Sequence, residues 1–370
     1  MNTYIDIHAI QTLPPSNINR DDTGAPKTAT FGGVPRQRVS SQAWKRAIRK
    51  DFETYLSANQ LGVRTKRVVD EVAARILEID SGWDLERART AATAIFTAAK
   101  IKVEVQKPKN GEEPAGAQSG YLMFLSARQI ANAAKFAIEH EGEKIGKKEA
   151  GALLDQDHSI DIAMFGRMIA DAADFNVDAA VQVSHALGVS AAEPEFDFFT
   201  AVDDVVEDAE ETGAGMLGTV QMMSSSLYRF ASTDMNSLAT NLGGRAEAIT
   251  AAAAFVKSFI RSLPTGKLNT FANWSLPDLV YVTVRNDRPV TLVNAFESPV
   301  VTEPGEDRRA AAAAKLAQEA RDIEEAYGDK PVAAWVFGLS KLVEPFEGLA
   351  ERVSQPQLLE AIEAHLNEAC

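Results

Sequence analysis

The sequence predicts an α+β protein in which a sheet domain is interrupted by a long helical segment. Residues 4–10 alternate between two sets of side chains, which is the period of a half-buried strand. Residues from about 63 to 180 show helical, alanine-rich periodicity, and strand-like patterns return at 219–231 and 279–284. We therefore expect a sheet with helices packed on one face, and a helical block inserted between its strands.

The remaining elements follow from local signals. Ser40 and Ser41 can cap a helix that runs from Gln42 to about Leu56. A second helix is expected over 246–263, where Pro264 and Gly266 stop it, and a third over 308–327, before Gly328. Residues 194–204 and the glycine-rich return after them predict a β-hairpin, either a protruding one or an ordinary edge hairpin.

Composition restricts the class of protein. The chain has 370 residues and a net charge of −14, and its only cysteine, Cys370, excludes an intrachain disulfide and a cysteine-based metal site. No apolar run reaches the roughly 20 residues that a transmembrane helix needs, and the first residues lack the pattern of a signal peptide. We expect a cytoplasmic protein with no membrane partner.

Positive charge is concentrated near the start of this acidic chain. Residues 20–50 carry eight basic side chains against Asp21 and Asp22, a local charge of +6, so the rest of the chain carries −20. Such a patch suits a protein that binds nucleic acid in one groove and repels it elsewhere. A solvated charged face is the alternative interpretation.

The pattern within this stretch indicates binding to a phosphate backbone. Lys45 and Arg49 are four residues apart and share one helical face, beside a row formed by Arg46 and Lys50. Small hydroxyl groups stand where free N–H groups and the helix dipole favour a phosphate. Contacts of this kind are independent of base sequence, and the pair Gly32-Gly33 would let the chain approach a ligand closely.

The segment 161–168 allows two interpretations. Met164, Phe165 and Met168 have the composition of a helix core. Alternatively, Arg167 and Met168, which follow a glycine, could present a flexible apolar side chain to nucleobases.

Signatures of catalysis are missing from the sequence. The five histidines show no HExxH spacing, and no G-x-S-x-G, Walker A or G-x-G-x-x-G motif occurs. Asp21-Asp22 and Asp203-Asp204 are adjacent pairs, which rarely converge on one metal. We therefore expect no enzymatic activity, no cofactor and no metal site.

Seven segments together resemble a known family in their order and spacing. They are Asn19-Arg20-Asp21-Asp22, Phe31-Gly32-Gly33, Ser40-Ser41-Gln42 with Lys45-Arg46-Ala47 and Arg49-Lys50, Gly166-Arg167-Met168, Phe199-Thr200-Ala201-Val202-Asp203-Asp204, Tyr228-Arg229-Phe230 and Asn294-Ala295-Phe296-Glu297. The chain resembles the CasC backbone subunit of type I-E CRISPR surveillance complexes (Cascade). The resemblance runs from residue 1 to about 300 and is weaker in the helical insertion and beyond Pro304.

The resemblance implies a modified RNA-recognition-motif (ferredoxin-like) palm, helical fingers and a β-hairpin thumb. The implied boundaries are 1–60 palm, 61–180 fingers, 181–192 palm, 193–222 thumb, and 223–370 palm with C-terminal helices. It also implies a subunit that oligomerises along a CRISPR guide RNA as a filament, with target DNA paired to the guide. The other implied partners are further copies of the chain, a large subunit, a small subunit, a guide-end-capping subunit and a repeat-processing endonuclease.

The resemblance assigns roles residue by residue. RNA binding is implied for Arg20, Lys27, Ser40, Gln42, Lys45, Arg46, Arg49, Arg167 and Met168. Nucleotide displacement by the thumb is implied for Phe199, Thr200 and Val202. DNA contact is considered for Lys100, Lys102, Lys107 and Lys109, for which a solvated loop is the favoured interpretation. Val34 departs from the family pattern, in which a lysine stands there, so a DNA-backbone contact at this position is not expected.

Two alternatives remain open. Related backbone subunits of other CRISPR types cut RNA with a loop aspartate and a metal, and Asp21 or Asp22 would then be the catalytic residue. The chain could also be a structural oligomer whose basic helix pairs with the acidic face of a neighbour.

Overall fold

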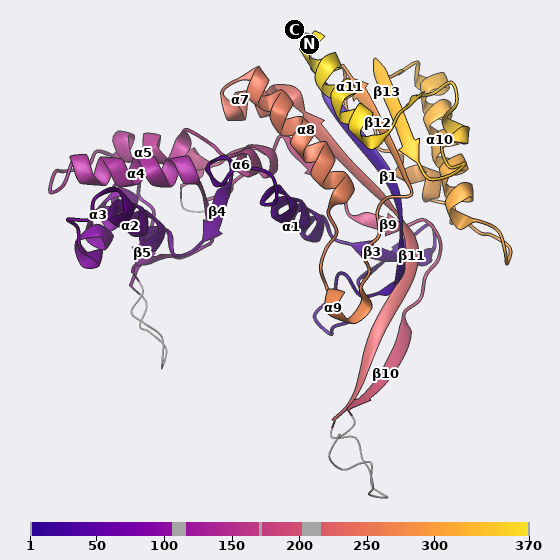
Figure 1. The fold of residues 1–370 in the computed structure, drawn as a ribbon, viewed down its shortest axis with the longest axis horizontal. Helices are drawn as coiled ribbons and strands as arrows, with labels where there is room; N and C mark the ends of the chain where they lie inside the picture. Colours follow the sequence, from indigo (N-terminus) through magenta and orange to yellow (C-terminus); the bar gives the residue numbers. More distant parts are fainter. Residues whose placement is uncertain (1, 106–115, 170–171, 202–215, 369–370) are drawn as a thin grey trace, which may run out of the picture. The chain divides into compact units, whose positions relative to one another are not determined.

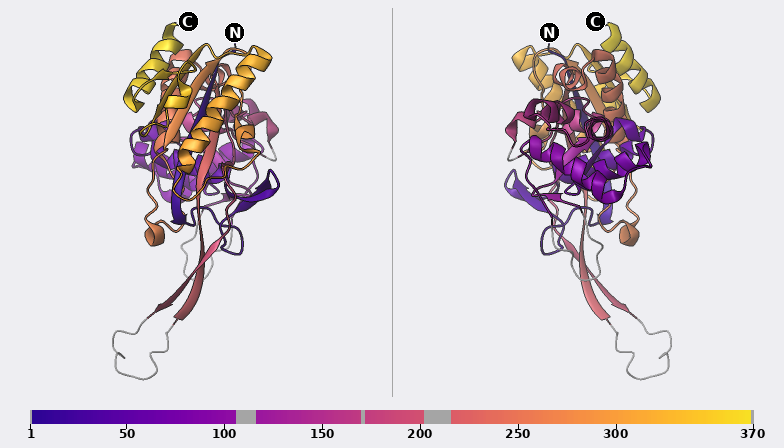
Figure 2. Two further views of the ribbon diagram at one scale, coloured as in Figure 1. Left: turned by 90° about the vertical axis from the view of Figure 1, so that its right-hand side faces the viewer. Right: turned by 90° about the vertical axis from the view of Figure 1, so that its left-hand side faces the viewer.

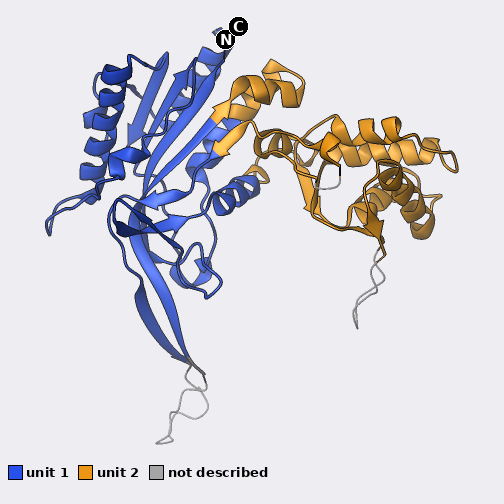
Figure 3. Cartoon of the chain, turned by 180° about the vertical axis from the view of Figure 1, so that it is seen from behind, with its two compact units in different colours: residues 1–51, 183–232, 253–370 blue, residues 52–182, 233–252 orange. Residues whose placement is uncertain are grey.

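The chain folds into two compact units in a computed structural model that describes residues 2–105, 116–169, 172–201 and 216–368. Unit 1 comprises residues 1–51, 183–232 and 253–370, and unit 2 comprises residues 52–182 and 233–252 (Figure 3). The chain therefore leaves unit 1 and returns to it twice. The domain boundaries implied by the family resemblance stay a prediction.

A large mixed sheet forms unit 1 and confirms the expected α+β class. Its strands follow the order β14-β13-β12-β1-β11-β9-β3-β2, and β10 also pairs with β11 (Figure 1). Their bounds are β1 Tyr4–Ser16, β2 Thr28–Phe31, β3 Val34–Val39, β9 Ala186–Gly188, β10 Glu195–Ala201, β11 Met216–Asp234, β12 Leu279–Arg285, β13 Ala333–Gly338 and β14 Glu351–Arg352. The helices of unit 1 are α1 Ser41–Phe52, α9 Leu268–Phe271, α10 Arg308–Tyr327 and α11 Gln355–Glu368.

The central strand β1 is buried on both faces, whereas its alternation predicted a half-buried strand. It pairs antiparallel with β12, from Tyr4 opposite Arg285 to Ile10 opposite Leu279. Helix α10 covers one face of the sheet, and α11 together with the end of α8 (Arg245–Arg261) covers the other (Figure 1). The expectation of helices on one face was therefore wrong.

Polar side chains of β1 are buried because other strands and loops supply their partners. His8 Nδ1 lies 2.9 Å from the hydroxyl of Tyr228. Asp6 accepts a hydrogen bond of 2.8 Å from the backbone N–H of Val290. A buried polar group is tolerated when it is hydrogen-bonded, so the alternating pattern of β1 did not reveal its two covered faces.

Strand β11 continues beyond the sheet as one side of a hairpin. β10 pairs with it antiparallel, from Glu195 opposite Met222 to Ala201 opposite Met216 (Figure 2). The predicted hairpin is thus confirmed for the described residues, and Val202 lies outside them.

Unit 2 is mainly helical, as the periodicity of residues 63–180 predicted. Its apolar core is formed chiefly by the first four of its helices and by Trp83 and Met123. Its elements are β4 Gly62–Thr65, α2 Val68–Ile79, α3 Leu85–Ala98, β5 Val103–Glu104, β6 Gln118–Ser119, β7 Met123–Ser126, α4 Ala127–Glu139, α5 Lys147–Asp155, α6 Ile160–Phe165, β8 Val181–Val183 and α7 Met235–Leu242. Helix α8 runs from unit 2 into unit 1.

Candidate nucleic-acid interface

Asn19 connects the loop after β1 to the start of α1. Its side-chain oxygen accepts a 2.8 Å hydrogen bond from Ser40 N, and its carbonyl accepts one of 3.0 Å from Lys27 N. Arg20 forms a β-bridge with Pro26 and is exposed. The loop therefore places Arg20 and Lys27 in the part of unit 1 where the basic helix begins.

The N-terminus of α1 is capped as predicted, but its polar groups are used within the protein. Ser40 is 5% exposed, and its hydroxyl accepts a 3.3 Å hydrogen bond from Ala43 N. His185 Nδ1 accepts from Ser41 N at 3.3 Å and lies 3.4 Å from Arg38 Nη1. Burial and the charges of Arg38 and Lys27 lower the pKa of His185, which favours the neutral acceptor.

Helix α1 divides its side chains between the interior and the surface. Trp44 and Ile48 are buried, whereas Lys45 and Arg49 are partly buried and Gln42, Arg46 and Lys50 are exposed. Partial burial lowers the pKa of Lys45. The residues expected to bind RNA near the start of the chain thus belong to one loop and one helix of unit 1. His185 also belongs to this site through its contacts with Ser41 and Arg38, and no motif in the sequence around it indicates this.

Arg36 belongs to the interior although it lies within the basic stretch. Its guanidinium donates to the carbonyl oxygens of Phe31 at 3.1 Å, Gly188 at 2.9 Å and Phe296 at 3.0 Å. Gly32 has a φ of +58°, and a Cβ at this position would overlap the carbonyl of Glu297. The expectation that Gly32 lets the chain approach a ligand was wrong, because the close approach is to protein backbone.

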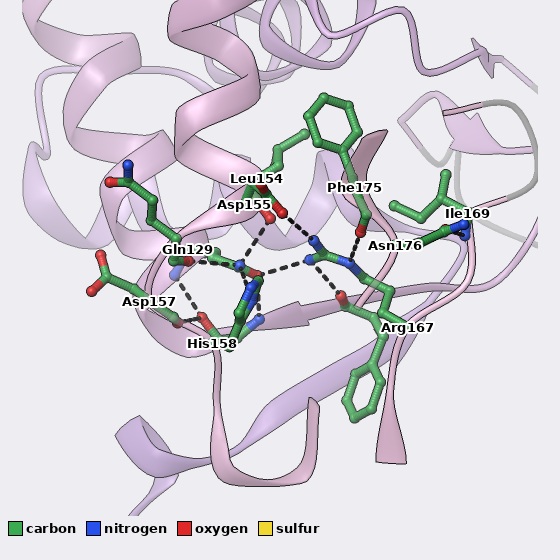
Figure 4. A network of polar contacts seen from close by, with 12 residues as sticks. Gln129, Leu154, Asp155, Asp157, His158, Arg167, Ile169, Phe175 and Asn176 are labelled. Carbon is green, nitrogen blue, oxygen red and sulfur yellow. Dashed lines mark hydrogen bonds and ion pairs between the residues drawn. The ribbon is translucent and has the colours of Figure 1, made fainter. Parts of the chain in front are cut away.

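Arg167 and Met168 differ sharply in exposure. Arg167 is 5% exposed, and its guanidinium is directed at oxygens of Phe124, Gln129 and Phe175 (Figure 4). Protein oxygens accept hydrogen bonds from Nε and Nη1 of this buried guanidinium, and contact of the Arg167 side chain with RNA stays a prediction. Met164 belongs to the core as one interpretation held, but Met168 is 82% exposed and does not.

Aromatic side chains line both faces of the β10–β11 hairpin. Phe199 is 39% exposed and packs on Gly218, where a Cβ would overlap its ring. Phe196 and Phe198, on the opposite face, are 68% and 63% exposed. Thr200 is exposed as well, so the two described thumb residues predicted from the sequence are accessible.

The lysines considered for DNA contact are only partly described. Lys100 is exposed and has a φ of +62°. Lys102 forms an ion pair of 2.7 Å with Glu104. Lys107 and Lys109 lie outside the described residues.

Asp21 shapes a turn. Its Oδ1 accepts hydrogen bonds from Thr23 Oγ1 at 2.7 Å, Thr23 N at 2.9 Å and Ala25 N at 3.0 Å. These bonds, that of the Thr23 hydroxyl first, lower the pKa of Asp21. Asp22 is exposed beside it, in a loop that lines an open pocket of about 560 Å³. Among the residues the structure describes, no group of three or more His, Cys, Asp or Glu is placed to hold a metal ion.

The described part of the chain has no helix both long and apolar enough to cross a bilayer. Its fold and surface define an α+β protein with an anchored basic helix, a geometry suited to binding a phosphate backbone. The chain matches the model of the family described as CT1975-like protein over residues 5–363, and it belongs to that family.

Two solved structures resemble the chain over almost its whole length. A chain of the structure titled "CRISPR RNA-guided surveillance complex, pre-nicking" is 35% identical with a TM-score of 0.85, covering 98% of this chain and 100% of that one. A chain of "CRISPR RNA-guided surveillance complex" is 30% identical with a TM-score of 0.75, covering 98% and 99%. No curated protein matches the chain.

Proposed function

We propose that this chain is a non-catalytic, guide-RNA-binding backbone subunit of a type I-E CRISPR surveillance complex. Family membership and the likeness to chains of two RNA-guided surveillance complexes support a subunit of such a complex. The observation that carries the RNA-binding role is the basic surface of α1. Its apolar side is fixed to the sheet through Trp44, while Gln42 and Arg46 are exposed.

This surface would hold the guide by its phosphates. Arg20, Lys27, Lys45, Arg46 and Arg49 supply positive charge from the loop and α1. Base pairing with the guide provides sequence specificity, so the protein needs to recognise only backbone and shape. The acidic remainder of the chain would limit binding of RNA elsewhere.

In the same proposal the sheet of unit 1 is a modified RNA-recognition-motif palm and the helices of unit 2 are the fingers. The β10–β11 hairpin is the thumb, which would displace a nucleotide with Phe199 and Thr200, and with Val202 beyond the described residues. Exposed Met168 would contact bases at the resulting kink. Lys100 and Lys102, with Lys107 and Lys109 beyond the described residues, are the candidates for contact with DNA, and a solvated loop is the alternative for all four. Further copies of the chain and the other Cascade subunits would complete the assembly.

The test is the length of RNA protected from ribonuclease after co-expression with a repeat–spacer array and the complex partners. We expect protected lengths that increase by a fixed step, which is the footprint of one subunit. Recovery of no RNA, or of one short fragment of arbitrary sequence, would contradict the proposal. Assembly that survives nuclease treatment unchanged would favour a structural oligomer instead.

The absence of catalysis is part of the proposal. Asp21 already uses one carboxylate oxygen to stabilise its turn, which leaves exposed Asp22 as the stronger catalytic candidate. We expect guide-paired RNA to remain intact in the presence of Mg²⁺. Cleavage that requires Mg²⁺ and disappears in Asp22→Ala would support a nuclease.

A further inference from the structure

Met168 is held in solvent between two buried neighbours. Its side chain is 82% exposed, whereas Arg167 is 5% and Ile169 is 1% exposed. A single exposed apolar residue needs no explanation by itself. The combination of a large exposed side chain with two anchored neighbours indicates that the local backbone is built to present it.

Backbone hydrogen bonds fix the segment on both sides of Met168. Arg167 N donates to Val177 O at 2.9 Å, and Val177 N donates to Arg167 O at 2.8 Å. Ile169 N donates to the side-chain oxygen of Asn176 at 2.6 Å. Gly166 has a φ of +77°, and a Cβ there would lie 2.7 Å from Val177 O, so this turn requires glycine.

The guanidinium of Arg167 fixes the segment further, through hydrogen bonds and an ion pair inside unit 2. Nε donates to Phe175 O at 2.9 Å, and Nη1 lies 3.4 Å from both Phe124 O and Gln129 Oε1 (Figure 4). Nη2 lies 3.7 Å from Asp155 Oδ1. These acceptors come from β7, α4, α5 and the turn before Asn176, so one side chain ties Met168 to four parts of unit 2.

Gln129 is itself held in place, which makes it a fixed acceptor. Its Nε2 donates to Leu154 O at 2.9 Å and to Gln156 O at 2.7 Å (Figure 4). Burying a guanidinium is costly unless its donors are used. An apolar side chain could fill the same volume, but it could not supply several directed bonds in a planar fork.

We propose that Arg167 is a positioning residue that holds Met168 as a fixed apolar contact for a nucleobase of the bound RNA. This inference rests on the proposed function. A contact whose backbone is fixed before binding loses less conformational freedom when the base arrives. The flexible thioether can still adapt to the face of any base, as sequence-independent binding requires.

The first arm of the test measures amide hydrogen exchange in the free, full-length chain. In Arg167→Gln we expect faster exchange in peptides that contain Ile169 or Val177, and partial restoration in Arg167→Lys. Ile76→Val, which trims the same unit's core in α2, should leave these peptides unchanged. Unaltered exchange in Arg167→Gln would overturn the positioning role, whatever the outcome with RNA.

The second arm is a double-mutant cycle on the dissociation constant of the full-length chain for RNA. Met168→Ala should weaken binding about fivefold or more, as loss of one base contact does. Arg167→Gln should weaken it by no more than that, and should add almost nothing in the Met168→Ala background. Additive effects would overturn the inference. Failure of the unmodified chain to bind RNA would overturn the proposed function. The exchange experiment uses the free chain, so its result would still decide the positioning role of Arg167.

Discussion

The guanidinium carbon of Arg229 lies 3.7 Å from the centre of the Trp44 ring. The same carbon lies 4.3 Å from the centre of the Phe259 ring of α8, and Nη1 donates to Gln11 Oε1 at 2.6 Å. Complete burial lowers the pKa of Arg229 to about 9, so it remains charged at neutral pH. A buried cation of β11 in contact with two aromatic rings thus joins the basic helix α1 to the sheet.

Trp44→Ala should destabilise unit 1 and weaken RNA binding together. The substitution removes a large buried side chain and leaves Arg229 without one of its rings, so we expect the free energy of unfolding to fall by about 3–5 kcal/mol. Denaturant unfolding of the full chain measures this. Trp44→Phe keeps a ring over Arg229 and should cost clearly less. Equal losses in the two variants would argue against the stacking.

Lys45→Ala combined with Arg49→Ala should weaken binding to RNA of every sequence. Because fewer counterions are released, the slope of log K against log salt should decrease by about one to two units. Fluorescence anisotropy over a series of salt concentrations measures this slope.

The matched control for that prediction is Lys330→Ala with Lys341→Ala. It also removes two positive charges, from exposed positions outside the candidate interface. The control should retain the slope of the unmodified chain. A slope that both pairs change equally would indicate a general charge effect and exclude a defined site on α1.

Gly32→Ala and Gly33→Ala should differ although the residues are adjacent. Both have positive φ, +58° and +77°, so each alanine should cost about 1–2 kcal/mol of backbone strain. Only the Cβ at position 32 meets the carbonyl of Glu297, which should add about 1–3 kcal/mol. Thermal unfolding of the two variants side by side measures the difference. The same melting temperature for both would show that the backbone at Glu297 shifts at little cost in free energy.

The buried pair of Asp6 and His8 should give opposing contributions to stability as pH changes. Burial raises the pKa of Asp6 to about 6, so its contribution is present at low pH and is lost as pH rises through 6. Burial, together with Arg285, lowers the pKa of His8 to about 3, so its contribution is present above pH 6.5 and is lost as pH falls toward 3.

Asp6→Asn should therefore unmask the contribution of His8. Between pH 6 and 4 the variant should lose stability on acidification more steeply than the unmodified chain, by up to about 1.4 kcal/mol per pH unit. Denaturant unfolding at several pH values measures the slope, and His8→Gln should change it in the opposite direction. Identical slopes in all three proteins would mean that neither group titrates in the folded state as proposed.

The sequence could predict the elements whose signals are local. The period of residues 308–327 and the glycine after them located α10 at its observed bounds. Ser40 marked the start of α1, although the helix ends at Phe52, earlier than the expected Leu56. The spacing of Lys45 and Arg49 was sufficient to place both on one side of that helix, since helical periodicity depends on neighbours in the chain.

Only the tertiary structure decided which arginines of the same motifs belong to the surface. Arg36, Arg167 and Arg229 are buried, whereas Arg20 and Arg46 are exposed. The groups that contact the buried arginines lie up to 261 residues away in the chain, which is the separation between Arg36 and its acceptor Glu297. A guanidinium is stable inside a protein only where the fold brings hydrogen-bond acceptors or aromatic rings to it. These partners are distant in the sequence, so no local sequence pattern predicts the contact.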